Sequence, residues 1–315
     1  IPLGSILGPL RRRAAMTHVI ERRIEPVTRR DAATAMPRVR RAWLGPLARH
    51  ALLIVVAALL LLPFYWMLVS ALKSNSDIFA RPLQWWPDPI QWQNVGDTIG
   101  SRYFPYLRLL GNSVFFAGGV TIGTVLSCAA VGYGFARLRF PGRDILFAIT
   151  LATLMIPPIV TFIPTYVLFA RLQLTGSYAP LILPAFFGNA FFIFMMRQFF
   201  LGIPRDLSDA ARIDGAGEFR IFWQIMLPLV RPALMVVAVF SLLYTWHDFF
   251  GPLIYLQDQS QFPLSLGLYS FKSQRTAEWA RIMMGSFLTT LPLIIVFLFT
   301  QRYFLRGIAT TGIKG

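Results

Sequence analysis

The chain has 315 residues, of which 56% are hydrophobic and only 14% charged, and its mean hydropathy is +0.57. Soluble domains carry about a quarter charged residues, so this composition argues against a soluble protein and indicates an integral membrane protein. The formal net charge is +16. Its position in the chain decides whether it indicates nucleic-acid binding or the orientation of a membrane protein.

Half of the net charge lies in the N-terminal tail. Residues 1–50 contain eleven arginines and only three acidic residues, Glu21, Glu25 and Asp31. Basic tails of this kind stay in the cytoplasm and orient the first membrane span, and no basic groove or aromatic platform follows that would favour nucleic-acid binding. We therefore expect residues 1–45 to form a disordered cytoplasmic tail and residues 46–315 to form the transmembrane domain.

A helix needs about 20 largely uncharged residues to cross the hydrocarbon core of a bilayer. Six stretches meet this requirement, and five of them contain no Asp, Glu, Lys or Arg, whereas the fifth in chain order contains only Asp248. The expected fold is all-α and integral to the membrane, with six transmembrane helices at 51–72, 112–136, 145–170, 172–196, 232–250 and 282–301.

Basic residues set the expected orientation. The tail, the link 137–143, the insert 201–231 and the C-terminal stretch are rich in arginine or lysine, so these segments and both termini should face the cytoplasm. The opposite loop, residues 73–111, contains Trp85, Trp86 and Trp92. Tryptophans in such a loop suit the membrane interface, or a surface that docks another protein.

Several kinds of chemistry lack the residues that they need. The only cysteine is Cys128, the histidines are His18, His50 and His247, and no lysine follows a glycine. The phosphate-binding sequence G-x-x-x-x-G-K-[ST] is therefore absent, and we expect no catalytic residue, no metal site and no cofactor in this chain. The chain lacks the nucleophile–base cluster that an integral membrane enzyme would need. It also has too few charged residues within the spans for a secondary transporter.

A polar insert at 205–228 separates the fourth and fifth predicted spans. Ser208 is a good N-cap residue for a short helix, Asp209 complements the helix dipole in its first turn, and Ala210 and Ala211 keep one side of the helix thin. The sequence "DGAG" then predicts a bend, followed by a second segment, 218–226, that ends near a proline. These residues alone fit either insertion into a cleft of another protein or an amphipathic helix lying on the membrane.

At this insert the chain resembles the permease subunits of ATP-binding-cassette importers, most closely the second permease of the maltose type. The family pattern Glu-Ala-Ala, Gly and Ile-x-Leu-Pro stands here as 209–211, Gly215 and 225–228, with Asp209 in place of Glu. The stretches "WHDFFGPLIYL" and "RGIATTGIKG" resemble the fifth-span region and C-terminal tail of the same family, and the resemblance extends over about residues 45–315.

The resemblance implies a type I importer fold in the inner membrane of a bacterium or archaeon. It implies a second, homologous permease, two ATPase subunits that bind ATP and Mg, an extracytoplasmic solute-binding protein, surrounding membrane lipid and no nucleic acid. The expected ATPase-coupling residues are Asp209, Ala210, Ala211, Asp214, Gly215, Ala216, Phe219, Ile225, Leu227 and Pro228, and the expected tail contacts with the ATPase are Thr310, Thr311, Gly312 and Lys314.

The resemblance favours a sugar as the solute and leaves glycerol-3-phosphate as an alternative. A candidate pathway follows from polar or helix-breaking residues within the spans, because these should avoid lipid. Its members are Pro157, Asn189, Trp246 and Asp248.

Overall fold

The computed structural model describes residues 39–274 and 278–311, all of them in helices, turns or loops and none in a strand. The chain divides into two units at residues 62 and 63, within helix α2 (Val39–Ala71). The described part of the first unit belongs to α2 alone, and residues 39–45, expected in the tail, are helical. Taken by itself, this unit exposes every side chain from Leu47 to Leu62, a continuous apolar surface of the kind that a membrane span has.

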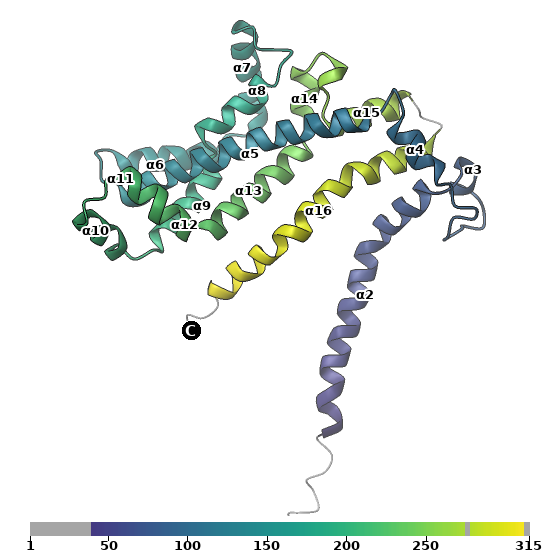
Figure 1. Ribbon diagram of the computed structural model, residues 1–315, viewed down its shortest axis with the longest axis horizontal. Coiled ribbons are helices and arrows are strands. Elements are labelled where there is room, and N and C mark those ends of the chain that lie inside the picture. Colours follow the sequence, from purple (N-terminus) through teal and green to yellow (C-terminus); the bar gives the residue numbers. More distant parts are fainter. Residues whose placement is uncertain (1–38, 275–277, 312–315) are drawn as a thin grey trace, which may run out of the picture. The chain divides into compact units, whose positions relative to one another are not determined.

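The second unit is built on a long helix, α5 (Tyr106–Arg137), which packs against α9 (Ala190–Leu201) and α13 (Arg231–Trp246). Helix α13 also packs against α16 (Trp279–Thr311), and Figure 1 shows these helices side by side. The remaining elements of this unit are α3 (Asn75–Ile78), α4 (Gln93–Ile99), α6 (Arg143–Ala152), η2 (Thr153–Met155), α7 (Pro158–Arg171), α8 (Ala179–Ile182), η3 (Leu183–Phe187), α10 (Asp206–Ile213), α11 (Glu218–Arg220), η4 (Ile221–Met226), α12 (Leu227–Leu229), α14 (Phe250–Tyr255), η5 (Gln259–Gln261) and α15 (Leu264–Gln274).

Four helical stretches are long and apolar enough to cross a membrane, namely Leu47–Ala71, Tyr106–Arg137, Ala179–Leu201 and Trp279–Gln301. Two further stretches reach that length only as bent pairs. The pair Arg143–Met155 and Pro158–Arg171 bends by 101°, and the pair Glu218–Leu229 and Arg231–Trp246 bends by 79°. The described residues therefore contain four to six candidate spans, and the predicted ranges 145–170 and 172–196 are not single straight helices.

Proline interrupts the predicted span 145–170, and glycine interrupts the predicted span 172–196. Proline has no N–H to donate and disfavours helical geometry in the preceding residue, and Ile156 and Pro157 are extended, with ψ of 118° and 133°. In the next predicted span, Gly188 has φ +93°, and Asn189 then caps α9 by accepting hydrogen bonds from the backbone N–H groups of Phe191 and Phe192.

Small residues let α5 approach its neighbours closely. A side chain added at Gly132 would lie 2.8 Å from Cβ of Met196 in α9 and 3.1 Å from the backbone N of Arg197. Closer to the middle of α5, one added at Gly123 would lie 2.8 Å from the ring of Phe186 in η3. Close approach of this kind is typical of helix packing in membranes, where small residues lie at the interface.

Two buried clusters hold the second unit together. One contains Tyr133 of α5, Met196 and Phe200 of α9 and Val237 of α13, and it extends to Ala211, Ile221 and Met226 of the insert. The other joins the opposite half of α5 to α13, α15 and α16 through residues such as Phe104, Trp246 and Phe271. The insert is thus packed onto the same core as α5, α9 and α13.

Candidate functional site

The insert between α9 and α13 forms two short helical segments joined by a sharp turn, as the sequence predicted. Helix α10 ends in a Schellman motif: the N–H of Gly215 bonds to the carbonyl of Arg212 at 3.0 Å, and that of Ala216 to the carbonyl of Ala211 at 2.9 Å. Gly215 has φ +80°, in the left-handed region that side-chain-bearing residues resist. The backbone then re-enters a helix at Glu218.

The predicted N-cap of the first segment is wrong. Helix α10 begins at Asp206, two residues before Ser208, and the backbone N–H groups of Ser208 and Asp209 bond to the carbonyl of Arg205 at 2.9 and 3.1 Å. Ser208 is therefore inside the first turn, where it is buried, and its hydroxyl has no hydrogen-bond partner among the described residues. Asp209 does lie in the first turn, together with Asp206, so the expected complement to the helix dipole is present.

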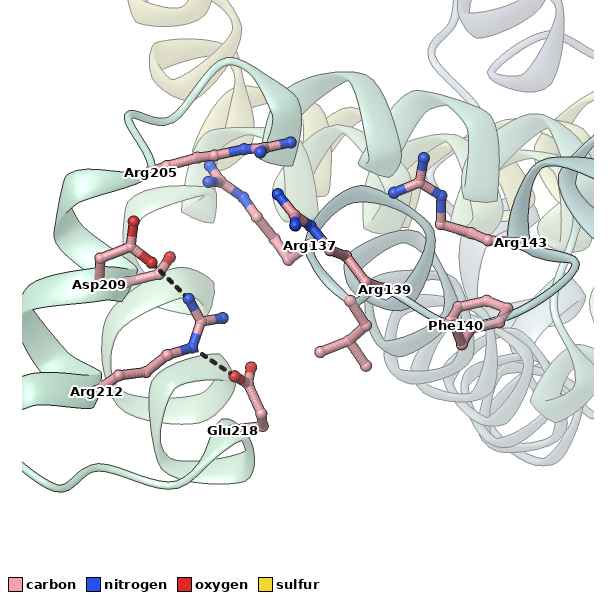
Figure 2. Close-up of a pocket in the computed structure, with 10 residues that line it drawn as sticks. Arg137, Arg139, Phe140, Arg143, Arg205, Asp209, Arg212 and Glu218 are labelled. Atoms are coloured by element: carbon pink, nitrogen blue, oxygen red, sulfur yellow. Dashed lines mark hydrogen bonds and ion pairs between the residues drawn. The ribbon is translucent and has the colours of Figure 1, made fainter.

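Arg212 links the two segments of the insert. Its guanidinium contacts Asp209 of its own helix at 2.6 Å and Glu218 of the second segment at 2.7 Å, as Figure 2 shows. The other carboxylate oxygen of Glu218 accepts a hydrogen bond of 2.9 Å from the hydroxyl of Tyr133 in α5. A polar chain thus runs from α10 through Glu218 to the long helix α5, and its members Arg212, Glu218 and Tyr133 were not predicted as site residues.

This network predicts a dependence on pH. The hydrogen bond from Arg212 is the main reason that the pKa of Glu218 is lowered from its ordinary value of 4.5. A lowered pKa stabilises the folded insert above pH 4.5, and that contribution is lost as pH falls through the lowered value. Amide exchange in residues 213–221, corrected for its intrinsic pH dependence, should therefore accelerate in wild type as the pH falls below 4.5 and through the lowered pKa.

The matched variant for this experiment is Glu218→Gln. It should exchange quickly at neutral pH already and show no further acid step, because its side chain does not titrate. An acid step of unchanged size in Glu218→Gln would assign the effect to another carboxylate.

The two faces of the insert differ in their surroundings. One face packs on the core through Ala211, Ile221 and Met226, with Phe222 5.0 Å from the ring of Tyr133. The other face exposes apolar side chains: Ile213 is 87% exposed, Phe219 77% and Trp223 53%, and the rings of Phe219 and Trp223 stack at 6.3 Å. Because exposed apolar clusters mark contact surfaces, the outer face is the part of the insert available to a partner.

The predicted coupling residues divide between these faces. Asp209, Ala210, Asp214, Gly215 and Phe219 are exposed, whereas Ala211, Ala216, Ile225 and Leu227 belong to the core cluster or pack against it. Pro228 is half-buried in α12. The structure thus places the predicted residues in one continuous segment, from α10 to α12, with Ala210 exposed and Ala211 buried on different sides of α10. Ile213 and Trp223 join the exposed face.

The candidate pathway residues lie at helix breaks or helix ends. Pro157 is exposed in the gap between η2 and α7, and Asn189 is exposed at the start of α9. The carboxylate of Asp248 accepts a hydrogen bond of 3.0 Å from the N–H of Gly251, close to the start of α14. Trp246 is 6% exposed, and its indole N–H donates to the carbonyl of Thr289 in α16 at 3.2 Å. Their role in a pathway stays a prediction.

The predicted tail contacts fall at the edge of the described chain. Thr310 and Thr311 are the last residues of α16. Gly312 and Lys314 lie outside the described residues.

Comparison with known proteins identifies the family. Residues 119–310, which include the insert, match the family described as binding-protein-dependent transport system inner membrane component. The chain belongs to this family. It is therefore a multi-pass membrane permease, a transport subunit of an ATP-binding-cassette system and not an enzyme.

Named relatives cover most of the chain. The sn-glycerol-3-phosphate transport system permease protein UgpE of Yersinia pestis bv. Antiqua is 35% identical over 82% of this chain and 94% of its own length. The arabinooligosaccharides transport system permease protein AraQ of Bacillus subtilis (strain 168) is 36% identical over 83% of this chain and 93% of its own length.

A solved structure has the same fold. It is a chain from a bacterial ABC transporter involved in the import of the acidic polysaccharide alginate, which aligns with a TM-score of 0.71 and 22% identity over 85% of this chain and 99% of its own. A second structure, of a bacterial alginate transporter in complex with a pentasaccharide-bound periplasmic protein, aligns with a TM-score of 0.58 and 16% identity over 83% of this chain and 93% of its own.

Proposed function

We propose that this permease forms half of the translocation pathway of an importer and that its insert, residues 205–228, binds an ATPase subunit and transmits the movement of that subunit to the spans. The observation that carries the proposal is the two-faced construction of the insert. Its inner face belongs to the core of α5, α9 and α13, while Ile213, Phe219 and Trp223 face outward without cover. A force applied to the outer face would reach the spans through packed side chains.

The proposal includes the rest of the assembly. A second, homologous permease would supply the other half of the pathway, two ATPase subunits would bind ATP and Mg, and an extracytoplasmic protein would deliver the solute. The periplasmic protein in the similar alginate transporter structure supports the last of these partners. The absence of a G-x-x-x-x-G-K-[ST] sequence in this chain supports separate ATPase subunits.

We propose a carbohydrate as the solute, with glycerol-3-phosphate as the alternative. The relative named for arabinooligosaccharides and the one named for sn-glycerol-3-phosphate are similar to this chain to nearly the same degree. The candidate pathway residues Pro157, Asn189, Trp246 and Asp248 include no cation, and a phosphorylated solute calls for cations. This favours an uncharged sugar, unless the second permease supplies the positive charge.

Reconstitution tests the function as a whole. The permease pair in vesicles should show solute-stimulated ATP hydrolysis and uptake only when the ATPase and the solute-binding protein are both present. Uptake without the ATPase would overturn the proposal, and so would hydrolysis by the permease pair alone. Uptake of a labelled sugar and of labelled glycerol-3-phosphate in parallel would separate the two solute classes.

The proposed topology has six spans with both termini in the cytoplasm. It requires the bent pair Arg143–Met155 and Pro158–Arg171 to cross the membrane once, and α13 to form the fifth span directly after the cytoplasmic insert. A reporter inserted beside Pro89 should then be active only in its extracytoplasmic form, because this loop follows the first span. A second reporter after the final residue should be active only in its cytoplasmic form. A cytoplasmic signal at Pro89 would contradict the six-span arrangement.

A further inference from the structure

A basic cavity lies beside the insert. Its volume is about 650 Å³, and a second cavity of about 570 Å³ shares Arg139, Phe140, Arg143 and Arg205 with it. We call the two together the arginine pocket. Figure 2 shows the guanidinium groups of Arg137, Arg139 and Arg205 gathered close together, with that of Arg143 nearby.

Positive charge in the arginine pocket exceeds the negative charge that balances it. Five arginines line the first cavity, but only two acidic residues do so, and both of these are bound by Arg212. Arg143 pairs with Asp144 at 2.9 Å, and Arg137 donates to the carbonyls of Phe200 and Ile203 at the end of α9. Within the described part of the chain, the guanidinium groups of Arg139 and Arg205 have no hydrogen-bond or ion-pair partner.

The start of α6 adds to the positive potential. Gly142, with φ +77°, turns the chain into this ten-residue helix, and residues 142–145 line the second cavity. The N-terminus of a helix carries unpaired N–H groups and the positive end of the helix dipole, which together favour anions. The carboxylate of Asp144 offsets part of this potential, but it is 76% exposed and already paired with Arg143.

The arginine pocket lies at the level where candidate spans end. Helix α5 ends at Arg137, α6 begins at Arg143 and α9 ends at Leu201. No residue of α6 is buried, and the apolar side chains of Ile145, Leu146 and Ile149 are between 50% and 68% exposed. Under the proposed topology this level is the cytoplasmic surface of the bilayer. Unpaired arginines there would suit the phosphate of an anionic phospholipid, and the exposed apolar helix beside them would suit its acyl chains.

We propose that the arginine pocket binds the phosphate group of an anionic membrane phospholipid, whose acyl chains lie along α6. Arg139 and Arg205 would donate paired N–H groups to the phosphate oxygens, a geometry that guanidinium groups favour. Basic pockets between membrane helices bind such head groups. Because Arg205 immediately precedes α10, a bound lipid would also fix the position at which the insert leaves the membrane.

The test compares two double variants that lose equal charge. In Arg139→Gln/Arg205→Gln both unpaired arginines are removed, whereas Arg220→Gln/Arg231→Gln removes two exposed arginines of the same region that do not line the arginine pocket. The full chain, purified from an equal mixture of phosphatidylglycerol and phosphatidylcholine, is assayed for retained lipid by native mass spectrometry. Preference for phosphatidylglycerol should fall about fivefold for each pocket arginine lost, and the control should keep the wild-type preference.

Further measurements distinguish a phospholipid from free phosphate and from an acidic segment of the ATPase. Inorganic phosphate at millimolar concentration should leave phosphatidylglycerol bound, because it has no acyl chains to contact α6, and displacement by phosphate would overturn the lipid assignment. Equal preference in wild type and in the pocket variant would also overturn it. Loss of ATPase co-purification in the pocket variant with unchanged lipid retention would instead assign the arginines to an acidic segment of the ATPase.

Discussion

Replacing Gly215 with valine should abolish uptake while leaving the permease inserted in the membrane. The N–H groups of Gly215 and Ala216 close α10, and Gly215 does so at φ +80°. A β-branched residue at this angle costs about 1–3 kcal/mol, which would displace the turn without unfolding packed spans. Co-purification of the ATPase should weaken in parallel with uptake in the same cells.

Two further variants isolate the backbone effect. Gly217 has φ −72°, and a side chain added there meets nothing within 4 Å, as is also true at Gly215. Gly217→Val therefore adds the same side chain without strain and should retain uptake. Gly215→Asn should retain more uptake than Gly215→Val, because asparagine tolerates the left-handed region. Full uptake and full ATPase association in Gly215→Val would show that the insert is only a membrane-surface helix.

Truncating Phe219 to alanine should weaken association with the ATPase by about tenfold or more, the scale expected for an aromatic residue at the centre of an interface. Phe219 is 77% exposed and stacks on Trp223, so both rings offer apolar area to a partner. The fold of the chain should survive, because Phe219 belongs to neither buried cluster. The measurement is the amount of ATPase retained by the purified permease pair.

Phe79→Ala provides the matched control for this variant. Phe79 is 65% exposed and also makes a contact between aromatic rings, with Trp279 at 6.1 Å, but it lies in the loop that follows the first span. Under the proposed topology that loop is extracytoplasmic, so ATPase retention should not change. Equal losses in Phe79→Ala and Phe219→Ala would mean that the assay reports general instability of the permease.

Composition and the length of the uncharged runs predicted the long spans well. The ranges 51–72, 112–136 and 282–301 lie within, or within one residue of, α2, α5 and α16, because uncharged runs of this length have few alternatives to a helix. The positions of the helix breaks do not follow from hydropathy. The sequence "GN" at 188–189 is a recognisable turn and N-cap, but it lies in an apolar run that hydropathy reads as continuous. Its effect is visible only in the left-handed Gly188 and the capping bonds of Asn189.

The candidate site was predicted as a segment but not as a network. Local spacing identified Gly215 as the bend, whereas the contact of Glu218 with Tyr133 joins residues 85 positions apart and has no local signal. Ser208 was assigned to the cap because its residue type is favoured there. The chain instead enters the helix at Asp206, and the hydroxyl of Ser208 is buried with no hydrogen-bond partner in residues 39–274 and 278–311.

The close approach at Gly132 has a mechanical consequence. Met196 and the backbone of α9 fill the space that a side chain of α5 would occupy at Gly132, so we expect the two helices to move together. Tyr133, the next residue of α5, donates a hydrogen bond to Glu218 of the insert. Helices α5 and α9 and the insert therefore form one packed unit. We therefore expect movement between conformations at the breaks that flank this unit, at Gly188 with its positive φ and at the bend between α12 and α13.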